Sequence, residues 1–405
     1  MKIAFVVQRY GADIVGGAEY LTRLFAEHLI QYHDIEVLTT CAKSYHTWEN
    51  EYPEGVEVVN GVPVRRFKNT KMRNSSKVSQ IQERAFYNNH SRDDELRWIE
   101  ENGPVCPDLI TYLKENADQF DCVIFFTFRY YQSYHGVLSV GKKAIITPFA
   151  EDDPALDLST TEEIFSRVGG IIYSTPEERA LIRQRVRFDE TEKVVGIIGS
   201  GIEGPDALQP VKVPPEYILY LGRIEGSKGC YTLFEFYQRL AEEMDSVPYL
   251  VLAGKDAIGI PKHGKIVYLG FVSEEEKASL LRGAKFLIMP SPCESLSLVT
   301  LEAMACGTPV LVNGECSVLK GHCVRSNAGL WYQDYDEFKE CTQYLLENDR
   351  IRVLLGENGK RYIESNYQWD HIEQKFLSLL RRFHGSSRGK SQQQSLDMDS
   401  SELRK

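Results

Sequence analysis

The sequence predicts an α/β protein with two doubly wound domains, each built on a parallel sheet. Three observations predict this class. Short runs of Val, Ile and Leu show no polar alternation, which is typical of strands covered on both faces. Segments with helical periodicity lie between the runs. A stretch with four prolines, GIEGPDALQPVKVPPE (201–216), separates two halves with the same pattern and is typical of a linker.

The first half contains apolar runs that each predict a strand. They are KIAFVVQ (2–8), IEVLTT (35–40), CVIFFTF (122–128), KAIITPF (143–149), GGIIYS (169–174) and KVVGIIGS (193–200). The segment 18–31 predicts a helix, because its apolar residues recur on one stripe. Asn60-Gly61, inside VEVVNGVPVRRF, is the one strong signal for a hairpin.

The second half repeats the pattern. Its runs are YILYLGR (217–223), PYLVLAG (248–254), KIVYLG (265–270), FLIMPS (286–291), PVLVN (309–313) and AGLWY (328–332). We therefore predict a first domain over 1–205 and a second over 206–365. The last residues, 386–405, are polar and poor in aromatics, which predicts a disordered tail.

Composition narrows the class of function. The 405 residues carry 47 basic and 58 acidic side chains, a net charge of −11, so we expect no nucleic-acid partner. The chain opens directly into an apolar run without the pattern of a signal peptide, and no run reaches the ~20 apolar residues of a membrane span. The nine scattered cysteines form no C-x-x-C pair. These features favour a cytoplasmic protein with reduced thiols.

Ligands of doubly wound sheets bind where the strands end at their carboxyl edge, so the loops there are the candidate sites. In QRYGADIVGGAEYL, Gly16 and Gly17 precede the first helix. Glycines there allow close backbone approach, and a helix N-terminus favours anions. The spacing is not that of a dinucleotide fingerprint. The alternative is a flexible turn.

Two cations follow the first strand of the second domain. Arg223 and Lys228 lie in LGRIEGSKG (221–229). A guanidinium and an ammonium on one loop can neutralise a diphosphate, the first by bidentate contact and the second as a point charge. The alternative is a pair of solvated surface cations.

The stretch PSPCESLSLVTLEAMACGTPV (290–310) places two carboxylates among apolar residues. Glu294 precedes a helix predicted to end at Cys306, and Glu302 lies in its second turn. The first turn offers free N–H groups to a phosphate. Eight residues separate the carboxylates, so one can meet a sugar ring while the other meets ribose hydroxyls. The alternative has both solvated, but their apolar neighbours argue against it because buried unpaired carboxylates are costly.

This stretch resembles the E-x7-E signature of the GT4 family of retaining glycosyltransferases, which have the GT-B fold. GGAE (16–19), LGRIEGSKG (221–229) and GFVSEEE (270–276) occur in that family's order. The resemblance covers residues 1–384. It implies two Rossmann-like domains facing across a cleft, the first for the acceptor and the second for a nucleotide-sugar donor. It also implies that the amphipathic segment at about 366–384 crosses back to the first domain.

The resemblance implies catalytic roles for three residues. Arg223 and Lys228 would hold the donor diphosphate and stabilise it as it leaves, and Glu294 would contact the hydroxyls of the donor sugar. Cations and helix-end amides would do the work of a divalent ion, so no metal and no further cofactor are expected. No Asp-x-Asp metal pair follows a strand in the sequence.

The remaining donor contacts are also carried over from the family. Gly16 and Gly17 would approach the distal phosphate, Phe271 and Val272 the nucleotide base, and Glu302 the ribose. The residues that would face the diphosphate at the helix start are Ser295, Leu296, Ser297, Leu298 and Val299.

Two positions depart from the family. Where many relatives have a histidine, ITPFAEDDP places Glu151, an acid that would repel phosphate and accept sugar hydroxyls. The alternatives are a slipped alignment or a plain loop acid. Where many relatives have glycine, this chain has Ser297, which we expect to cost little because serine caps helices well.

The acceptor side is less defined. TFRYYQSYHG (127–136) follows a central strand and suggests Arg129 or Tyr130 as acceptor contacts, although tyrosines also fill cores. PVRRFKNTKMRNSSK (63–77) holds six cations and no acid. It is either a solvated loop or a basic arm that attracts anionic lipid on the inner face of the membrane.

The sequence therefore predicts a metal-independent, retaining glycosyltransferase. It would move a hexose-type sugar from a UDP- or GDP-sugar to a hydroxyl of a glycan or lipid-linked acceptor, in polysaccharide biosynthesis. The alternatives are a catalytically inactive nucleotide-sugar-binding subunit and a GT-B epimerase. A phosphorylase would need a pyridoxal-binding lysine, for which the sequence offers no site.

Overall fold

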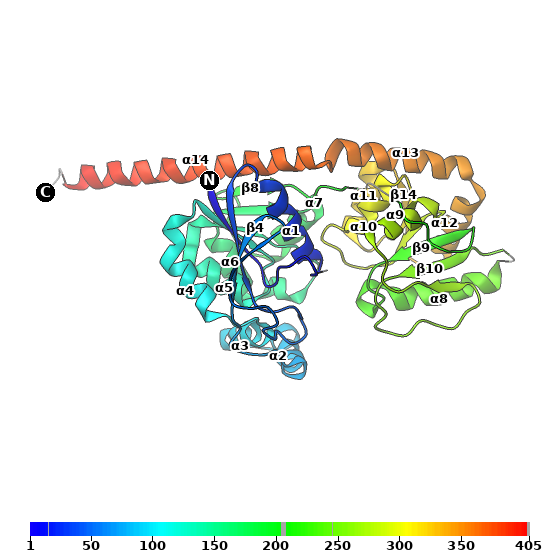
Figure 1. Cartoon of the computed structure of the whole chain (residues 1–405), viewed down its shortest axis with the longest axis horizontal. Helices are drawn as coiled ribbons and strands as arrows, with labels where there is room; N and C mark the ends of the chain where they lie inside the picture. Colours follow the sequence, from blue (N-terminus) through cyan, green and yellow to red (C-terminus); the bar gives the residue numbers. More distant parts are fainter. Residues whose placement is uncertain (15, 204–207, 245, 403–405) are drawn as a thin grey trace. The chain divides into compact units, whose positions relative to one another are not determined.

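The computed structural model describes residues 1–14, 16–203, 208–244 and 246–402, with side chains through residue 386. The chain forms two compact units (Figure 1). Unit 1 comprises Met1–Ile198 and Glu373–Lys405, and unit 2 comprises Gly199–Ile372. The domain boundary predicted between residues 205 and 206 falls on 204–207, outside the described residues.

Unit 1 is built on an eight-stranded sheet in the order β3-β4-β2-β1-β5-β6-β7-β8. The strands are β1 (Lys2–Val6), β2 (Asp34–Thr40), β3 (Gly55–Val59), β4 (Val62–Phe67), β5 (Cys122–Phe126), β6 (Ala144–Thr147), β7 (Gly170–Tyr173) and β8 (Val194–Ile197). All neighbours pair in parallel except β3 and β4. The predicted hairpin joins that pair, and Asn60 and Gly61 both have positive φ, as its tight turn requires.

Helices cover both faces of this sheet. They are α1 (Gly17–Leu29), α2 (Ser75–Tyr87), α3 (Arg92–Asn102), α4 (Pro107–Asn116), α5 (Tyr131–Val140), α6 (Ser159–Arg167) and α7 (Pro176–Arg185). Short 3₁₀ helices occupy Ala117–Gln119, Gly141–Lys143 and Pro154–Asp157. Figure 1 shows α2 and α3 as a pair at one end of unit 1. The non-alternating runs are explained by burial, since every residue of β5 is buried.

The C-terminal helix α14 (Trp369–Glu402) begins in unit 2 and belongs to unit 1 from Glu373 onward, as the resemblance implies. Phe376 is fully buried, and its ring lies 5.3 Å from that of Phe25 and 6.5 Å from that of Phe5, centroid to centroid. The disordered tail over 386–405 stays a prediction. The helix continues through Glu402, but its polar composition there gives it little apolar surface to bury.

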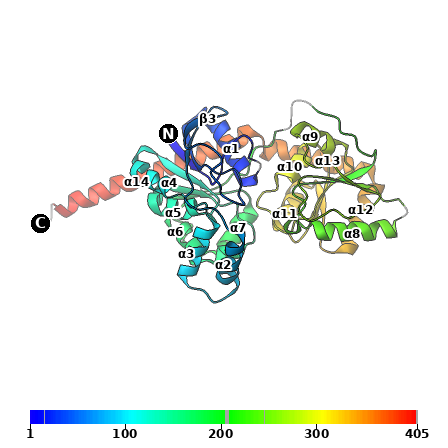
Figure 2. The ribbon, with the colours of Figure 1, turned by 60° about the horizontal axis from the view of Figure 1, so that its bottom comes forward.

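Unit 2 is built on a six-stranded, all-parallel sheet in the order β11-β10-β9-β12-β13-β14. The strands are β9 (Tyr217–Leu221), β10 (Tyr249–Ala253), β11 (Ile266–Tyr268), β12 (Leu287–Met289), β13 (Val310–Asn313) and β14 (Gly329–Tyr332). The helices are α8 (Cys230–Glu243), α9 (Glu274–Gly283), α10 (Leu298–Ala305), α11 (Ser317–Ser326), α12 (Tyr335–Glu347) and α13 (Asp349–Asn366). Figure 2 shows α8 and α12 together, on the other side of the strands from α9 and α13.

Both sheets are doubly wound, so each has a point at which the strand order reverses. In unit 1 this point lies between β1 and β5, and in unit 2 it lies between β9 and β12. Loops leaving adjacent strands diverge there to opposite faces, which opens a crevice at the carboxyl edge. The loops after these four strands therefore carry the candidate sites. Within the described chain, no helix combines the length and apolar character that crossing a bilayer requires.

Candidate functional site

In unit 2, the loop after β9 is pressed against the loop after β12. Gly229 ends a 3₁₀ turn at Gly226–Lys228 and has a φ of +74°. A Cβ atom at Gly229 would lie 2.2 Å from the carbonyl oxygen of Pro290, which is far inside van der Waals contact. Glycine at this position therefore allows the two loops to meet and brings Lys228 close to the segment that carries Glu294.

The approach of the loops pairs two predicted site residues. Lys228 Nζ lies 2.9 Å from Glu294 Oε1, and both side chains are mostly buried. The Arg223 guanidinium is more exposed and donates to Glu225 over 3.1 Å. The backbone at Arg223 is held in place by a hydrogen bond, because the buried Tyr220 hydroxyl donates to the Arg223 carbonyl oxygen over 2.6 Å. The two cations thus lie on one loop, but only Lys228 contacts Glu294.

The helix α10 begins after Glu294, as predicted, but the side chain of its N-cap residue does not cap it. Ser297 is the N-cap of α10 and has a φ of +60°, in the left-handed region. Its side chain accepts no backbone hydrogen bond and instead lies 2.8 Å from the Thr300 hydroxyl. The expectation that serine compensates by capping was wrong. Glycine suits this position because a left-handed residue with a Cβ costs about 1 kcal/mol. The helix ends at Ala305, with Cys306 as its C-cap.

Glu302 points into the interior of unit 2 and is not a solvated helix residue. Its Oε1 accepts from Lys277 Nζ over 2.8 Å, and its Oε2 is buried without a hydrogen-bond partner among the described residues. Burial raises the pKa of Glu302, and the nearby Lys277 opposes that rise. Burial alone would lower the pKa of Lys277, but the charges of Glu302 and Glu274 outweigh it and raise that pKa. Sequence reasoning missed Lys277. The available signal was a single cation directly after three acids in SEEEK.

The predicted base contacts lie at the carboxyl edge of the same sheet. Phe271 and Val272 follow β11, and Phe271 is 77% exposed, a large value for an aromatic side chain. The amide of Gly254 donates to the carbonyl of Gly270 over 2.8 Å. A Cβ at Gly254 would lie 1.9 Å from the carbonyl oxygen of Gly222. Glycines thus draw the backbone after β9, β10 and β11 together and leave Phe271 projecting beside them.

In unit 1, the glycine pair after β1 has two separate structural roles. A Cβ at Gly16 would lie 2.2 Å from Glu19 Oε2 and 2.9 Å from an Arg9 nitrogen, whereas a Cβ at Gly17 would meet nothing within 4 Å. Gly16 therefore makes room for a buried ion pair, and Gly17 leaves open space. Arg9 donates to Glu19 Oε1 over 2.8 and 2.5 Å and to the Lys43 carbonyl over 2.6 Å. No spacing rule in the sequence singles out this pair.

The predicted acceptor residues follow β5 and are held by neighbouring segments. Arg129 forms an ion pair with Asp153 at 2.5 Å, and its carbonyl accepts from the buried Asn102 over 3.0 Å. Tyr130 is the N-cap of α5, and the Trp48 ring meets it edge to face at 5.7 Å. Trp48 in turn donates its indole N–H to the Asn102 carbonyl over 2.7 Å. Arg129 and Tyr130 are therefore set by residues distant in sequence.

Neutral side chains around the same edge carry buried polar atoms that have no hydrogen-bond partner in the described chain. Each is at most 8% exposed. They are Gln8 after β1, Thr127 after β5, Thr147 at the end of β6, and Gln132 and Ser133 in the first turn of α5. Strand pairing brings three of them near one another, since the Thr127 amide donates to the Thr147 carbonyl over 2.8 Å and β1 is adjacent to β5. Buried orphan polar groups need a ligand or water to offset their desolvation.

Glu151 follows β6 in a loop that a buried acid holds. Glu178, at the start of α7, accepts from the Ala150 amide over 2.6 Å and also from the Ser174 amide. Burial raises the pKa of Glu178 to about 7, although these backbone N–H groups act in the opposite direction. Glu178 was not singled out from the sequence. It fixes the backbone next to Glu151, so the acid predicted in place of the family histidine lies on an ordered loop.

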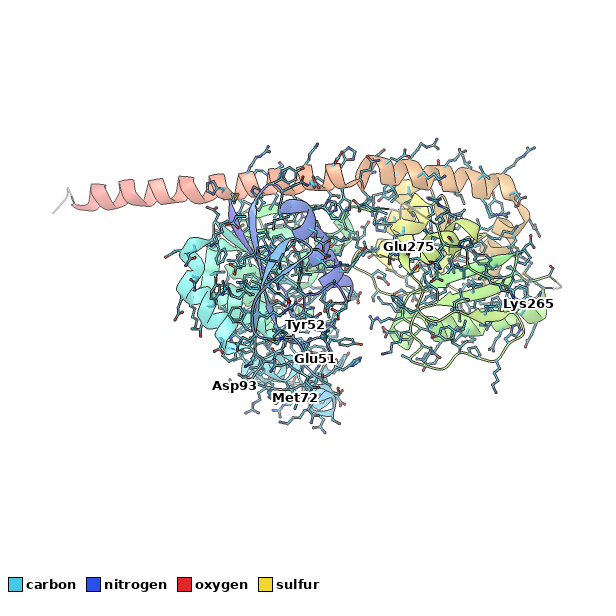
Figure 3. All side chains as sticks on the ribbon, in the orientation of Figure 1. Glu51, Tyr52, Met72, Asp93, Lys265 and Glu275 are labelled. Atoms are coloured by element: carbon cyan, nitrogen blue, oxygen red, sulfur yellow. The ribbon has the colours of Figure 1, made fainter. Side chains whose placement is uncertain are left out.

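Five of the six cations in the basic segment 63–77 form ion pairs within unit 1. Each of its six cations meets an acid or buried polar atoms: Arg65 meets Glu36, Arg66 meets Glu57, Lys68 meets Glu54, Lys71 and Lys77 meet Glu101, and Arg73 donates to Asn102. Arg66 is 1% exposed and lies 3.8 Å from the centroid of Tyr52, which Figure 3 labels on the loop before β3. The cations of the predicted basic arm therefore mostly form ion pairs with acids of unit 1.

The geometry of unit 2 supports anion chemistry. Arg223, Lys228 and the free N–H groups at the start of α10 supply positive charge at the switch point of the sheet. Glu294 and Glu302 supply acceptors for hydroxyl groups, and each is held by a lysine. No group of three or more His, Cys, Asp or Glu side chains in the described portion of the chain is arranged to hold a metal ion.

Comparisons with known proteins agree with this geometry. Residues 208–362 match the family described as "Glycosyl transferases group 1". An uncharacterized glycosyltransferase (MJ1607) of Methanocaldococcus jannaschii is 24% identical, over 94% of this chain and 98% of that protein. The O-antigen chain mannosyltransferase B of Escherichia coli is 33% identical, over 38% of this chain and 43% of that protein.

Solved structures share the fold at low identity. Sucrose-phosphate synthase of Thermosynechococcus elongatus has a TM-score of 0.68 at 17% identity, over 95% of this chain and 99% of that one. HepE of Anabaena, in complex with UDP and glucose, has a TM-score of 0.65 at 14% identity, over 94% of this chain and 100% of that one. The family match, these relatives and the two parallel sheets confirm the predicted resemblance. The chain is thus similar to the group 1 glycosyltransferases over residues 208–362, is GT4-like in its motifs, and has the GT-B fold.

Proposed function

We propose that this enzyme moves a hexose-type sugar from a nucleotide-diphosphate donor to a hydroxyl of a glycan or lipid-linked acceptor, with retention of configuration and without a metal ion. The observation that carries the proposal is the Lys228–Glu294 pair at the switch point of unit 2, beside Arg223 and the start of α10. The relatives support it, since HepE was crystallised with UDP and glucose and another relative is named a mannosyltransferase.

Unit 2 would bind the donor. Arg223 and Lys228 would contact the diphosphate, together with the amides from Ser295 to Val299. Glu302 would accept the ribose hydroxyls, and its buried, unpartnered Oε2 supports this role because the atom has capacity for one more donor. The exposed Phe271 and its neighbour Val272 would contact the base of a UDP- or GDP-sugar. Gly16, Gly17 and Glu151 of unit 1 complete the donor set that the family resemblance implies.

In the proposed reaction, negative charge develops on the leaving phosphate oxygen. The acceptor hydroxyl oxygen would bond to the anomeric carbon on the face from which the phosphate oxygen departs. The electron pair of the breaking carbon–oxygen bond would stay on that phosphate oxygen, which would also take the hydroxyl proton. Lys228, Arg223 and the α10 amides would stabilise the departing charge in place of a divalent ion. Glu294 would orient a sugar hydroxyl, since its carboxylate is already engaged by Lys228.

Unit 1 would bind the acceptor around Arg129 and Tyr130. The orphaned amide and hydroxyl groups of Gln8, Thr127 and Gln132 support an acceptor rich in hydroxyls, because neutral donors and acceptors match neutral hydroxyl groups. Arg129 is already paired with Asp153, so we do not assign it to an acidic group of the acceptor. The ion pairs of segment 63–77 weaken the charge argument for membrane attraction, so the proposal includes no membrane contact through that segment.

A thermal-shift panel of nucleotide sugars identifies the donor, because a ligand at 100 times its dissociation constant adds about 2.7 kcal/mol of stability. Donor hydrolysis and transfer are then measured for Lys228→Ala and Glu294→Ala, and we expect turnover to fall about 100-fold or more in each. Lys339→Ala is the matched control, since its ammonium pairs with Glu243 between α12 and α8. Retained turnover in both site variants would refute the assignment.

Three further readouts separate the finer claims. Turnover that survives a chelator supports metal independence. NMR of the product reports whether the anomeric configuration of the donor is kept. A wild-type chain that binds the donor but never turns it over would be an inactive binding subunit, and release of an altered free sugar would identify an epimerase.

A further inference from the structure

A buried histidine contacts the segment that leads into α10. His322 lies on α11 and is fully buried. Its Nε2 is 2.9 Å from the carbonyl oxygen of Leu296, the residue just before the left-handed Ser297. A carbonyl can only accept, so Nε2 carries the hydrogen in this contact. The histidine therefore holds the backbone at the point where the predicted diphosphate contacts begin.

The second ring nitrogen is also engaged. His322 Nδ1 lies 3.2 Å from the Tyr362 hydroxyl on α13. With the hydrogen on Nε2, Nδ1 accepts and Tyr362 donates. The Tyr362 oxygen in turn accepts from Arg325 Nε over 3.2 Å, and the Tyr367 hydroxyl lies 3.4 Å away. Burial, and secondly the charge of Arg325, lower the pKa of His322 to about 4, so the ring is neutral near pH 7.

The start of α10 needs such support. Ser297 provides no side-chain cap for the helix, and its left-handed backbone costs about 1 kcal/mol. The Leu296 side chain is 2% exposed, so the segment is also held on its apolar side. His322 is the polar anchor of the same residue. Because the ring uses both nitrogens within the protein, it is not available as a metal ligand.

We propose that His322 is a positioning residue for the donor site: it holds the Leu296 carbonyl so that the first amides of α10 face the donor diphosphate. The proposal rests on the proposed function and assigns a role to a residue outside the family motifs. The expected effect is selective for one part of the donor. Loss of the anchor should weaken binding of the diphosphate and leave the contacts to the base and ribose unchanged.

The test compares two amide variants that differ by one methylene group. In His322→Gln, the side-chain N–H can reach the position of Nε2, whereas in His322→Asn it cannot. Binding of UDP and GDP to the full chain is measured by titration calorimetry beside uridine and guanosine. For His322→Asn we expect affinity for the nucleoside diphosphate to fall about 10-fold, the usual effect of one hydrogen bond, with nucleoside affinity unchanged. His322→Gln should recover most of the loss.

Several outcomes overturn the proposal. Unchanged diphosphate affinity in a folded His322→Asn variant would do so, and so would an equal loss for nucleoside and diphosphate, since that pattern indicates general packing. If His322→Asn does not fold, Tyr362→Phe carries the test, because it removes the donor to Nδ1 and leaves the ring in place. We then expect a smaller selective loss, about 3-fold, and its absence refutes the role. A wild-type chain that binds neither UDP nor GDP would instead count against the proposed function.

Discussion

Both sheets are doubly wound, but they differ in the polar groups at their switch points. In unit 2, the loops after β9 and β12 present cations and carboxylates that are paired yet partly accessible, as in Lys228–Glu294. In unit 1, the loop after β1 presents a nearly inaccessible pair, Arg9–Glu19, and neutral side chains near it, such as Gln132, carry buried polar atoms without partners among the described residues. Under the proposed function, one doubly wound scaffold would serve an anionic ligand in one unit and a neutral, hydroxyl-rich ligand in the other.

Breaking the buried Arg9–Glu19 pair should have the largest effect and tests the comparison between the two units. Arg9→Met would leave the Glu19 carboxylate buried without its cation, and we expect the free energy of unfolding to fall by about 3–5 kcal/mol. Lys228→Met in unit 2 should cost less stability, because its pair is 20% and 13% exposed, against 10% and 6% for Arg9 and Glu19. Chemical denaturation measures both.

A second variant completes this test. Replacing both partners, Arg9→Met with Glu19→Met, should recover much of the lost stability because no unpaired charge remains. Equal, small losses for Arg9→Met and Lys228→Met would remove the distinction between a structural pair in unit 1 and a functional pair in unit 2.

The contact between the loops after β9 and β12 can be broken at one glycine. Gly229→Ala adds a Cβ at 2.2 Å from the Pro290 carbonyl oxygen and forces alanine into a positive φ, so we expect a loss of about 2 kcal/mol or more. Sugar transfer should fall as well, because Lys228 moves with its loop. Gly264→Ala is the control, since no heavy atom lies within 4 Å of its added Cβ and its φ is not positive. Similar stability for the two variants would contradict the close approach.

For the unpartnered buried groups of unit 1, we predict that a substitution raises stability and lowers activity. Gln132→Leu removes a fully buried amide whose two polar atoms lack partners in the described chain, so stability should rise by about 1 kcal/mol. Transfer to the acceptor should fall about 10-fold while hydrolysis of the donor stays unchanged, if one hydrogen bond to the acceptor is lost. Calorimetry and initial-rate kinetics give the two readouts. Gln184→Leu, at an exposed position of α7, is the control. A destabilised Gln132→Leu variant with normal transfer would reverse this interpretation.

The left-handed residue at the start of α10 predicts a smaller effect. Ser297→Ala keeps the Cβ and loses the hydroxyl contact to Thr300, whereas Ser297→Gly loses the same contact and also relieves the positive φ. We expect the glycine variant to be about 1 kcal/mol more stable than the alanine variant. Thermal unfolding of the two proteins measures the difference. Equal stabilities would show that the backbone there carries no such cost.

The smallest expected effect concerns the basic segment. Because five of its six cations pair with acids of unit 1, the protein should sediment little with anionic liposomes, and Lys68→Gln with Lys71→Gln should change nothing. Substantial sedimentation of the wild type that these substitutions abolish, and that salt screens, would restore the basic arm as a membrane contact.

Sequence patterns predicted the fold and much of unit 2. Each apolar run became a strand, and most of these strands are buried, although β8 and β11 are only partly so. The Glu294 and Lys228 motifs lie at adjacent strand ends, where short spacing along the chain from each strand determines their position. The partners of these residues were harder to predict. Lys277 reaches Glu302 from another helix, and Trp48 and Asn102 position Tyr130 and Arg129 from distant segments. Local periodicity carries no information about which segments meet.

By itself, the amino-acid sequence determined the strands, the helices between them and the loops that carry charge, because these depend on patterns within a few residues. The tertiary structure alone decided which charges are free and which are neutralised. It paired five of the six cations of 63–77 with acids, placed Arg9 with Glu19 in the interior, and left polar atoms of Gln8 and Gln132 without partners among the described residues. Ionic contacts and burial depend on which segments are in contact, and only tertiary folding determines which segments those are.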